Sequence, residues 1–253
     1  MSAERRACSR LLIAAIILLA GVLAVLLQRE FARETPESAA RRNEFEQIYA
    51  KGTWASDIQG KGTSGGGSTL DATKVYRVFL QDFLAKQRIR SVVDAGCGDW
   101  EFSQAIDWTG IDYLGLDIVP SVIAENRRRF GAGKVRFAVA DIVRDELPPA
   151  DLLVVKDVLQ HLSNADIARF LAQLPRYRHV LLVNDVLPDS LSAEPADIPT
   201  GRYRRLDPTR PPFSLPGVKV LVWRYGGATK LVVYLKRASE PAVGDAASPP
   251  TQK

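Results

Sequence analysis

Three aspartates follow successive apolar segments and have the chemistry to hold a polar ligand. Asp94 begins residues 94–98 (DAGCG), Asp117 ends residues 113–117 (YLGLD), and Asp141 follows residues 137–140 (FAVA). In an open parallel sheet, ligands bind in the crevice outside the carboxyl ends of the strands. Because an ionised carboxylate only accepts hydrogen bonds, three of them at such an edge suit a ligand with hydroxyl and amine hydrogens.

Gly96 and Gly98 let the backbone pass close beneath that ligand, since neither carries a side chain. A helix predicted over residues 100–108 would then offer free backbone amides to it. A dinucleotide-binding fingerprint requires a third glycine three residues after the second. That position holds Glu101, whose charge would repel a pyrophosphate. The pattern therefore disfavours a dinucleotide and favours another nucleoside-containing ligand.

Asp117 and Asp141 match the two ends of a nucleoside. Asp117 stands 19 residues after Gly98, close to the spacing of about 20 at which an acidic residue binds ribose hydroxyls. The alternative is a surface aspartate that caps the next helix. Asp141 offers an acceptor for an exocyclic amine, and Ile142 beside it offers an apolar surface for a purine.

The surrounding pattern alternates strands with helices. Near-continuous apolar runs indicate parallel strands covered by helices on both faces. Strands are predicted at residues 91–94, 112–116, 135–139, 151–156 and 179–184, and helices at residues 70–88, 100–108, 120–130 and 164–174. Two final strands, residues 218–225 and 229–236, are separated by Gly226-Gly227-Ala228 and predict an antiparallel hairpin.

Residues 93–98 (VDAGCG), Asp117 and residues 140–142 (ADI) resemble the successive motifs of class I S-adenosylmethionine-dependent methyltransferases. The resemblance covers about residues 70–236. It implies an α/β fold with a Rossmann-like, doubly wound, seven-stranded and mostly parallel sheet that ends in an antiparallel hairpin. It also implies S-adenosyl-L-methionine as cofactor. The implied cofactor-binding residues are Asp94, Gly96, Cys97 and Gly98 for the methionine part, Asp117 for the ribose, Asp141 and Ile142 for the adenine, and in addition Ile118 and Lys156.

In this family the segment after the fourth strand faces the sulfonium and the methyl acceptor. Here it reads Lys156 to Leu162 (KDVLQHL). His161 is a candidate catalytic base because its unperturbed pKa lies near 6.5; the alternative is a histidine that packs within a turn. Asp157 is the second candidate catalytic residue. A base is not obligatory, because methyl transfer depends mainly on an in-line arrangement of acceptor and sulfonium.

Leu11 to Leu27 is an uninterrupted apolar run of 17 residues with arginines on both sides. Its length lies at the lower edge of the roughly 17–25 residues that span a bilayer as a helix. A cleaved signal peptide is the alternative, but no small-x-small cleavage site follows. The balanced arginines leave the orientation open. Because the cofactor is cytoplasmic, we expect a single-pass anchor in the inner (cell) membrane with the catalytic domain facing the cytoplasm.

The remaining segments complete the expected organisation. Residues 1–10 precede the anchor at 11–27; residues 28–69 form a linker with a short helix at 38–50 and a glycine-rich loop; residues 70–237 form the methyltransferase domain; and residues 238–253 form a disordered tail. The glycine-rich stretch at 61–68 is either a passive connector or a lid over the cofactor. The basic stretch at 201–205 (GRYRR) is either a solvated turn or a contact for an acidic substrate.

Composition narrows the function classes. The net charge of +5 is scattered along the chain, and residues 156–159 (KDVL) differ from the Asn/Asp-Pro-Pro-Tyr motif of nucleic-acid methyltransferases. Two cysteines and two histidines form no visible metal-ligand cluster, so we expect neither a nucleic-acid partner nor a metal. The sequence thus predicts a membrane-tethered enzyme that methylates a small-molecule or lipid-like acceptor. The alternative is a catalytically silent domain that binds the cofactor or a partner.

Overall fold

The computed structural model describes residues 34–54, 63–187 and 196–237. The chain divides into two units, residues 1–40 and residues 41–253. Of the first unit only residues 34–40 are described, and they include the start of helix α2 (Pro36–Ala50). The apolar run from Leu11 to Leu27, predicted as a membrane anchor, and the predicted tail at 238–253 lie outside the described residues. No helix within the described ranges is long and apolar enough to cross a membrane.

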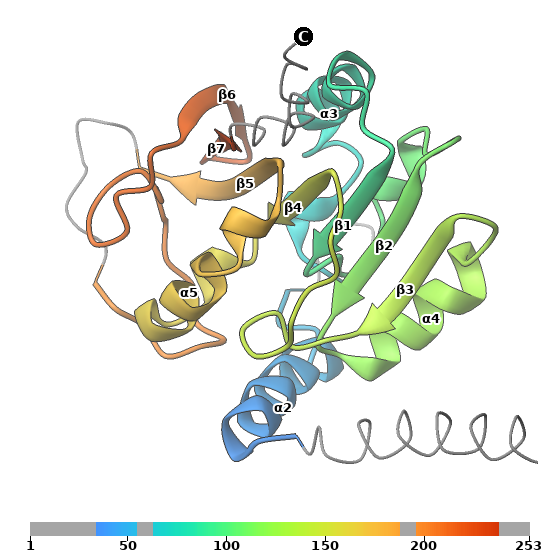
Figure 1. Cartoon of the computed structure of the whole chain (residues 1–253). Helices are drawn as coiled ribbons and strands as arrows, with labels where there is room; N and C mark the ends of the chain where they lie inside the picture. Colours follow the sequence, from blue (N-terminus) through green and yellow to red (C-terminus); the bar gives the residue numbers. More distant parts are fainter. Residues whose placement is uncertain (1–33, 55–62, 188–195, 238–253) are drawn as a thin grey trace, which may run out of the picture. The chain divides into compact units, whose positions relative to one another are not determined.

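A seven-stranded sheet forms the centre of the second unit, in the order β3-β2-β1-β4-β5-β7-β6 (Figure 1). The first five strands are parallel; β7 runs antiparallel to β5, and β6 runs antiparallel to β7. This topology confirms the predicted Rossmann-like sheet with its final hairpin. The strands are β1 (Ser91–Ala95), β2 (Asp112–Asp117), β3 (Val135–Val139), β4 (Leu152–Lys156), β5 (His179–Val186), β6 (Val218–Tyr225) and β7 (Ala228–Lys236).

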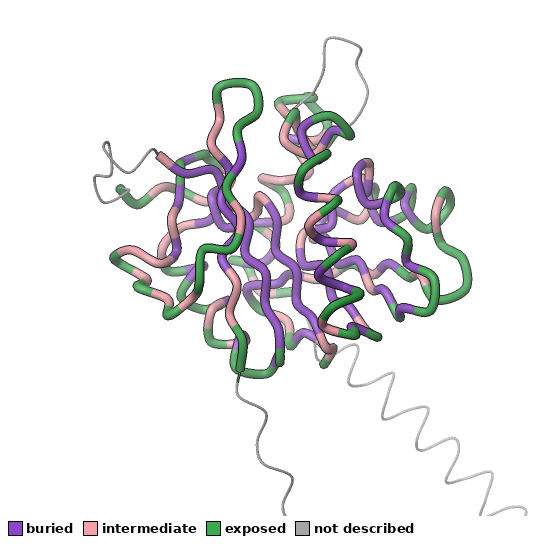
Figure 2. Tube along the Cα trace, turned by 90° about the horizontal axis from the view of Figure 1, so that it is seen from above, coloured by how far each residue is buried: buried purple, intermediate pink, exposed green. Residues whose placement is uncertain are grey.

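Helices cover both faces of the sheet, because successive strand residues point to opposite sides. Val92 packs in one apolar cluster with α3 (Lys74–Lys86) and α4 (Pro120–Phe130). Val93 packs in another with α5 (Asn164–Leu171). Figure 2 shows the buried residues gathered along the strands and on the helix sides that face them. Four short 3₁₀ turns complete the described part: η1 (Gly66–Ser68), η2 (Ser103–Ala105), η3 (Leu159–His161) and η4 (Leu174–Arg176).

The predicted helix over residues 100–108 is wrong. The structure has turns there and the single 3₁₀ turn η2. Trp100 adopts a φ of +59°, which a right-handed helix does not allow. Its ring is buried against Tyr113, Phe130 and Phe137. The positive φ at Trp100 directs its ring into these contacts, and the residues that follow form turns and η2 in place of a helix.

Local signals that act over a few residues are confirmed. The Ser163 side chain accepts a hydrogen bond from the Asp166 amide at 3.2 Å and caps α5. Gly226 and Gly227 adopt φ values of +54° and +81°, as a two-residue hairpin turn of type I′ requires. Helix α3 begins at Lys74, later than the predicted start at residue 70, and residues 70–73 form a turn instead.

Candidate functional site

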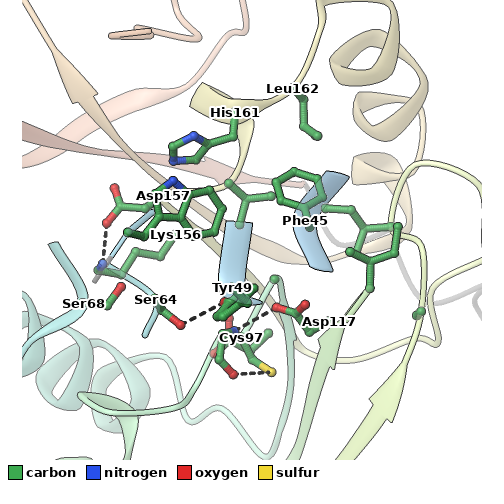
Figure 3. Close-up of a pocket in the computed structure, with 18 of the residues that line it drawn as sticks. Phe45, Tyr49, Ser64, Ser68, Cys97, Asp117, Lys156, Asp157, His161 and Leu162 are labelled. Atoms are coloured by element: carbon green, nitrogen blue, oxygen red, sulfur yellow. Dashed lines mark hydrogen bonds and ion pairs between the residues drawn. The ribbon is translucent and has the colours of Figure 1, made fainter. Parts of the chain in front are cut away.

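A pocket lies at the carboxyl ends of β1, β2, β3 and β4, and every residue predicted to act there lines its wall (Figure 3). Parallel pairing brings the ends of these strands to one edge of the sheet, so positions far apart in the sequence meet. The predicted residues are Asp94, Gly96, Cys97, Gly98, Asp117, Ile118, Asp141, Ile142, Lys156, Asp157 and His161. The structure thus supports the shared location, while the role of each residue stays a prediction.

Sequence reasoning missed much of the opposite wall. It comes from α2, from the turn after it, from the glycine-rich stretch and from the segments beyond the strand ends. The residues that lie outside every predicted site segment are Arg41, Phe45, Tyr49, Trp54, Phe102 and Val143. Ser64 and Ser68 belong to the stretch for which a lid was one alternative, and Val158 and Leu162 belong to the stretch expected to face the acceptor. One signal was available: Arg41, Phe45 and Tyr49 are spaced four residues apart and therefore share one side of a helix.

Gly96 and Gly98 are required by their close neighbours as well as by their backbone. Their φ values are +83° and +55°. A Cβ on Gly96 would lie 2.3 Å from Cγ2 of Val158, and one on Gly98 would lie 2.4 Å from Oγ of Ser64. The loop is therefore pressed between the β4 end and the glycine-rich stretch, and a larger residue at either position would push these walls apart.

Asp117 is buried at the end of β2. Its Oδ2 accepts a hydrogen bond from the Gly98 amide at 3.1 Å, and its Oδ1 accepts one from the Val119 amide at 3.0 Å. Burial raises the pKa of Asp117 to about 6, although these amides act in the opposite direction. Each oxygen keeps a further lone pair for a ligand hydroxyl.

Asp94 is the second buried carboxylate of the pocket. The Tyr113 hydroxyl donates to its Oδ2 at 2.6 Å. Burial raises the pKa of Asp94 to about 6, against the effects of this hydrogen bond and of the Lys156 charge. Within the described residues neither Asp94 nor Asp117 forms an ion pair, so the pocket holds two desolvated carboxylates that a cationic ligand would stabilise.

Asp141 already has a partner on α2. Nη2 of Arg41 lies 2.7 Å from its Oδ2, and Nε of Arg41 donates to the same carboxylate at 3.1 Å. Oδ1 also accepts a hydrogen bond from the Val143 amide at 3.0 Å. The carboxylate predicted to meet an amine is thus held in place by an arginine that the sequence analysis did not include in the site.

Asp157 and Lys156 belong to a buried network of alternating charges. Lys156 Nζ lies 2.5 Å from Oδ2 of Asp157. Oδ1 of Asp157 lies 2.8 Å from Nζ of Lys230, and Lys230 Nζ also lies 2.7 Å from Oδ1 of Asp185. Burial favours the neutral acid, yet the two lysines hold the pKa of Asp157 below its usual range. Asp157 also adopts a φ of +58°, a conformation rare for a residue with a side chain. These contacts make Asp157 a fixed anion and a poor proton acceptor.

His161 contacts protein atoms with both ring nitrogens. Nδ1 lies 3.0 Å from the Arg202 carbonyl oxygen, so we assign the proton to Nδ1. The Gln160 side chain accepts from the Asp185 amide through Oε1, which directs its NH₂ group to Nε2 of His161 at 3.4 Å. Burial lowers the pKa of His161. The ring is therefore neutral at pH 7. The lone pair on its Nε2 accepts only a long hydrogen bond, from the Gln160 NH₂ group at 3.4 Å.

The glycine-rich stretch is anchored at both ends of the pocket. At one end, Oδ2 of Asp99 accepts from the amides of Thr63 and Ser64 at 2.5 and 3.2 Å. At the other, Lys156 Nζ donates to the Gly67 carbonyl oxygen at 2.9 Å. Ser64 and Ser68 thereby line the pocket, and a lid over the cofactor stays a prediction.

The basic stretch at 201–205 packs beside the pocket and is absent from its wall. Arg204 is buried and donates to the carbonyl oxygens of Ala196 and Leu162 at 2.8 and 3.0 Å. Arg202 and Arg205 are exposed. This segment therefore supports η3 and His161 through the backbone, and Arg204 is engaged by the protein itself.

Known methyltransferases resemble part of this chain in sequence. Residues 92–178 match a family model described as a methyltransferase domain. A segment of 100 residues, 38% of this chain, is 33% identical to magnesium-protoporphyrin O-methyltransferase of Rhodobacter capsulatus. That segment spans 45% of the length of the relative.

Two solved structures share the fold. Magnesium protoporphyrin IX methyltransferase from Synechocystis PCC 6803, with bound SAH, has a TM-score of 0.53 at 14% identity over 78% of this chain and 94% of its own. The N-methyltransferase NodS from Bradyrhizobium japonicum WM9, also with SAH, has a TM-score of 0.54 at 13% identity over 75% and 97%. Residues 92–178 are therefore similar to a methyltransferase domain, and the chain shares the fold of these two SAH-bound methyltransferases.

Proposed function

We propose that the protein transfers a methyl group from S-adenosylmethionine to a small-molecule or lipid-like acceptor. The observation that carries the proposal is the pocket that collects the predicted residues at the β1–β4 ends. The two buried carboxylates, Asp94 and Asp117, fit this cofactor because it is a cation, whereas an anionic dinucleotide would be repelled.

Different residues of the pocket would bind different parts of the cofactor. Asp117 would accept the ribose hydroxyls, and Ile118 lies beside it. Asp141 would accept the adenine amine, with Ile142 against the ring. Asp94 and the Gly96–Gly98 loop would hold the methionine part. The amine, hydroxyl and sulfonium chemistry of the cofactor matches a wall that offers acceptors and negative charge.

The other end of the pocket would take the acceptor. When bound, the cofactor supplies an electrophilic methyl group; the protein's task is to align the acceptor and exclude water. Phe45, Trp54 and Leu162 supply apolar walls there, and the Trp54 and His161 rings lie 4.8 Å apart. The Nε2 atom of His161 would accept a proton from a hydroxyl or amine acceptor if Gln160 gives way. Asp157 would hold Lys156 and Lys230 in place.

The relatives support a small acceptor without naming it. The Rhodobacter protein is named for methylation of magnesium-protoporphyrin, and the NodS structure is that of an N-methyltransferase. Oxygen and nitrogen acceptors thus both occur on this fold. The apolar side chains around Trp54 favour an acceptor with a hydrophobic portion over a highly charged one.

A catalytically silent cofactor-binding domain is the second candidate. It is favoured by one observation: both nitrogens of His161 contact protein atoms, and Asp157 is fully ion-paired. Such a domain would bind the cofactor as tightly as an enzyme and differ only in turnover.

We further propose that the chain is a single-pass protein of the inner (cell) membrane with this domain facing the cytoplasm. The proposal rests on the apolar run from Leu11 to Leu27 and on the cytoplasmic location of the cofactor. A 17-residue apolar run is long enough to span a thin or locally adapted bilayer.

Methyl transfer separates the two candidate functions. Incubation of the full chain with isotopically labelled methyl donor and a lipid and metabolite extract should place label in at least one small molecule. Asp117→Ala, which removes the ribose acceptor, should lower that signal by about tenfold or more at sub-saturating donor. Binding of the donor without any labelled product, across aqueous and lipid fractions, would instead support the silent domain.

Cofactor affinity should fall as the pH drops through 6. The pKa of Asp94 and of Asp117 is raised to about 6 in the empty pocket. A cation beside Asp94 and hydroxyl groups that donate to Asp117 would each lower the pKa of the carboxyl they contact. Below pH 6 the empty protein therefore carries protons that the complex must release. The dissociation constant should rise by up to about tenfold per pH unit for each carboxyl.

Calorimetric titration with S-adenosylmethionine between pH 8 and pH 5 measures this dependence. In Asp117→Asn, which carries no titrating group at that position, the slope should be shallower than in the unmodified chain. An affinity that stays constant or increases toward pH 5 would show that these carboxylates do not meet the cation.

Membrane attachment has a direct test. The full chain should remain with the membrane after a carbonate wash, and a reporter fused after Lys253 should be accessible from the cytoplasm. A chain that lacks residues 1–33 should move to the supernatant. Recovery of the full chain in the supernatant, or a reporter on the outer side, would contradict the proposal.

A further inference from the structure

Three aromatic side chains, Trp54, His161 and Tyr203, form a row that leads out of the pocket. The ring centroids of Trp54 and His161 lie 4.8 Å apart, and those of His161 and Tyr203 lie 5.7 Å apart. Trp54 and His161 line the pocket, whereas Tyr203 lies outside its wall and is 50% exposed. Figure 3 shows His161 on the far side of the cavity from Cys97 and Asp117. This aromatic row therefore extends the pocket outward at its proposed acceptor end.

The segment that carries Tyr203 is fixed to its neighbours. The Gly201 amide donates to the His161 carbonyl oxygen at 2.8 Å. The Leu206 amide donates to the Asp185 carbonyl oxygen at 2.7 Å, and the Tyr203 hydroxyl donates to Oδ2 of Asp185 at 2.9 Å. The ring of Tyr203 is thus held in place although it is half exposed. A fixed aromatic ring loses little conformational entropy when a ligand stacks on it.

The two carboxylates beside the aromatic row are already paired with lysines. Oδ1 of Asp185, the residue that holds Tyr203, lies 2.7 Å from Nζ of Lys230. Both oxygens of Asp157 pair with lysines, at 2.5 and 2.8 Å. A sugar needs such acceptors for its many hydroxyl hydrogens. The surroundings of the row therefore favour a ligand that stacks over one that is rich in hydroxyl groups.

Arg205 supplies a positive charge near the outer end of the row. Its side chain is exposed, and it forms no ion pair with any residue that the structure describes. Burial and the Asp185 charge raise the pKa of Tyr203, whereas the Arg205 charge lowers it, so the guanidinium lies near the Tyr203 hydroxyl. A guanidinium is planar and pairs well with a carboxylate or a phosphate.

We propose that the aromatic row is the outer part of the acceptor site and that the acceptor carries a flat conjugated ring with one anionic oxygen group. This rests on the proposed function and names the substrate class of the same site. The ring stacks along Trp54 and His161, and its carboxylate or phosphate pairs with Arg205. Aromatic rings stack favourably beyond the area that they bury, so the row selects a flat acceptor over a saturated one of equal size.

Binding of small probes to the full chain, measured by equilibrium dialysis with and without S-adenosylhomocysteine, tests the proposal. Naphthoate and naphthyl phosphate carry both a flat ring and an anion. Naphthalenemethanol lacks the anion, cyclohexanecarboxylate lacks the flat ring, and glucose phosphate has a sugar in place of the ring. The two anionic naphthalenes should bind at least about tenfold more tightly than cyclohexanecarboxylate and glucose phosphate, and the tighter of the two identifies the preferred anion.

Substitutions separate the ring contact from the charge contact. Trp54→Leu and Tyr203→Leu each remove one ring and should weaken naphthoate binding by about threefold or more. Arg205→Gln should reduce the affinity for naphthoate to that for naphthalenemethanol, which this variant binds as the unmodified chain does. Tyr225→Leu and Arg224→Gln are the matched controls, because these exposed side chains lie on β6 outside the pocket; both should bind naphthoate normally.

Three outcomes would overturn the proposal: no binding of naphthoate, equal binding of naphthoate and cyclohexanecarboxylate, or unchanged naphthoate binding in both Tyr203→Leu and Arg205→Gln. Should Trp54→Leu fail to fold, the two variants at the half-exposed and exposed positions still decide. Tighter binding of glucose phosphate than of naphthoate would replace the flat acceptor by a sugar. Failure of the proposed function looks different: the unmodified chain would bind no S-adenosylhomocysteine, whatever the result with naphthoate.

Discussion

Two buried carboxylates, Asp94 and Asp117, have no ion-pair partner among the residues that the structure describes, and they dominate the chemistry of this site. Placing such groups away from water costs free energy, and the raised pKa of each expresses that cost. Hydrogen bonds offset part of this cost: the Gly98 and Val119 amides donate to Asp117, and the Tyr113 hydroxyl donates to Asp94. The carboxylate oxygens still have unused hydrogen-bond acceptor sites, and these face the pocket. A cationic ligand with hydroxyl groups would satisfy them.

The walls around these carboxylates close the pocket by polar contacts. The glycine-rich stretch is tied to Asp99 and Lys156, and α2 is tied to the end of β3 through Arg41. Phe45 of α2 also packs against the apolar cluster that contains Val93. The sheet beneath supplies the rigid part.

The strand ends could be predicted from the sequence because their signals are local. A run of apolar residues that ends in Asp94 or Asp117 can be recognised within about five or six consecutive residues. The parallel topology then brings the carboxyl ends of these strands together. The helix predicted at residues 100–108 failed because burial of the Trp100 ring is a tertiary effect. The residue pattern there carries no sign of the positive φ.

Contacts between distant segments were out of reach for the same reason. Arg41 meets Asp141 a hundred residues away, and Lys230 reaches Asp157 from the antiparallel strand β7. A single sequence does not pair these positions. It does show Arg41, Phe45 and Tyr49 at helical spacing, which identifies one side of a helix but not what that side covers. The acceptor end of the pocket, near His161, depends most on such contacts.

We propose above all that Asp117 and its neighbours hold S-adenosylmethionine at the strand ends. Calorimetric titration of the chain with this cofactor tests it most directly when Asp117→Ala is compared with Asp112→Ala. Asp112 begins the same strand at its far, exposed end. We predict saturable one-to-one binding that Asp117→Ala weakens by about tenfold or more, with Asp112→Ala unchanged. No binding by the folded chain, or equal binding by both variants, would contradict the account.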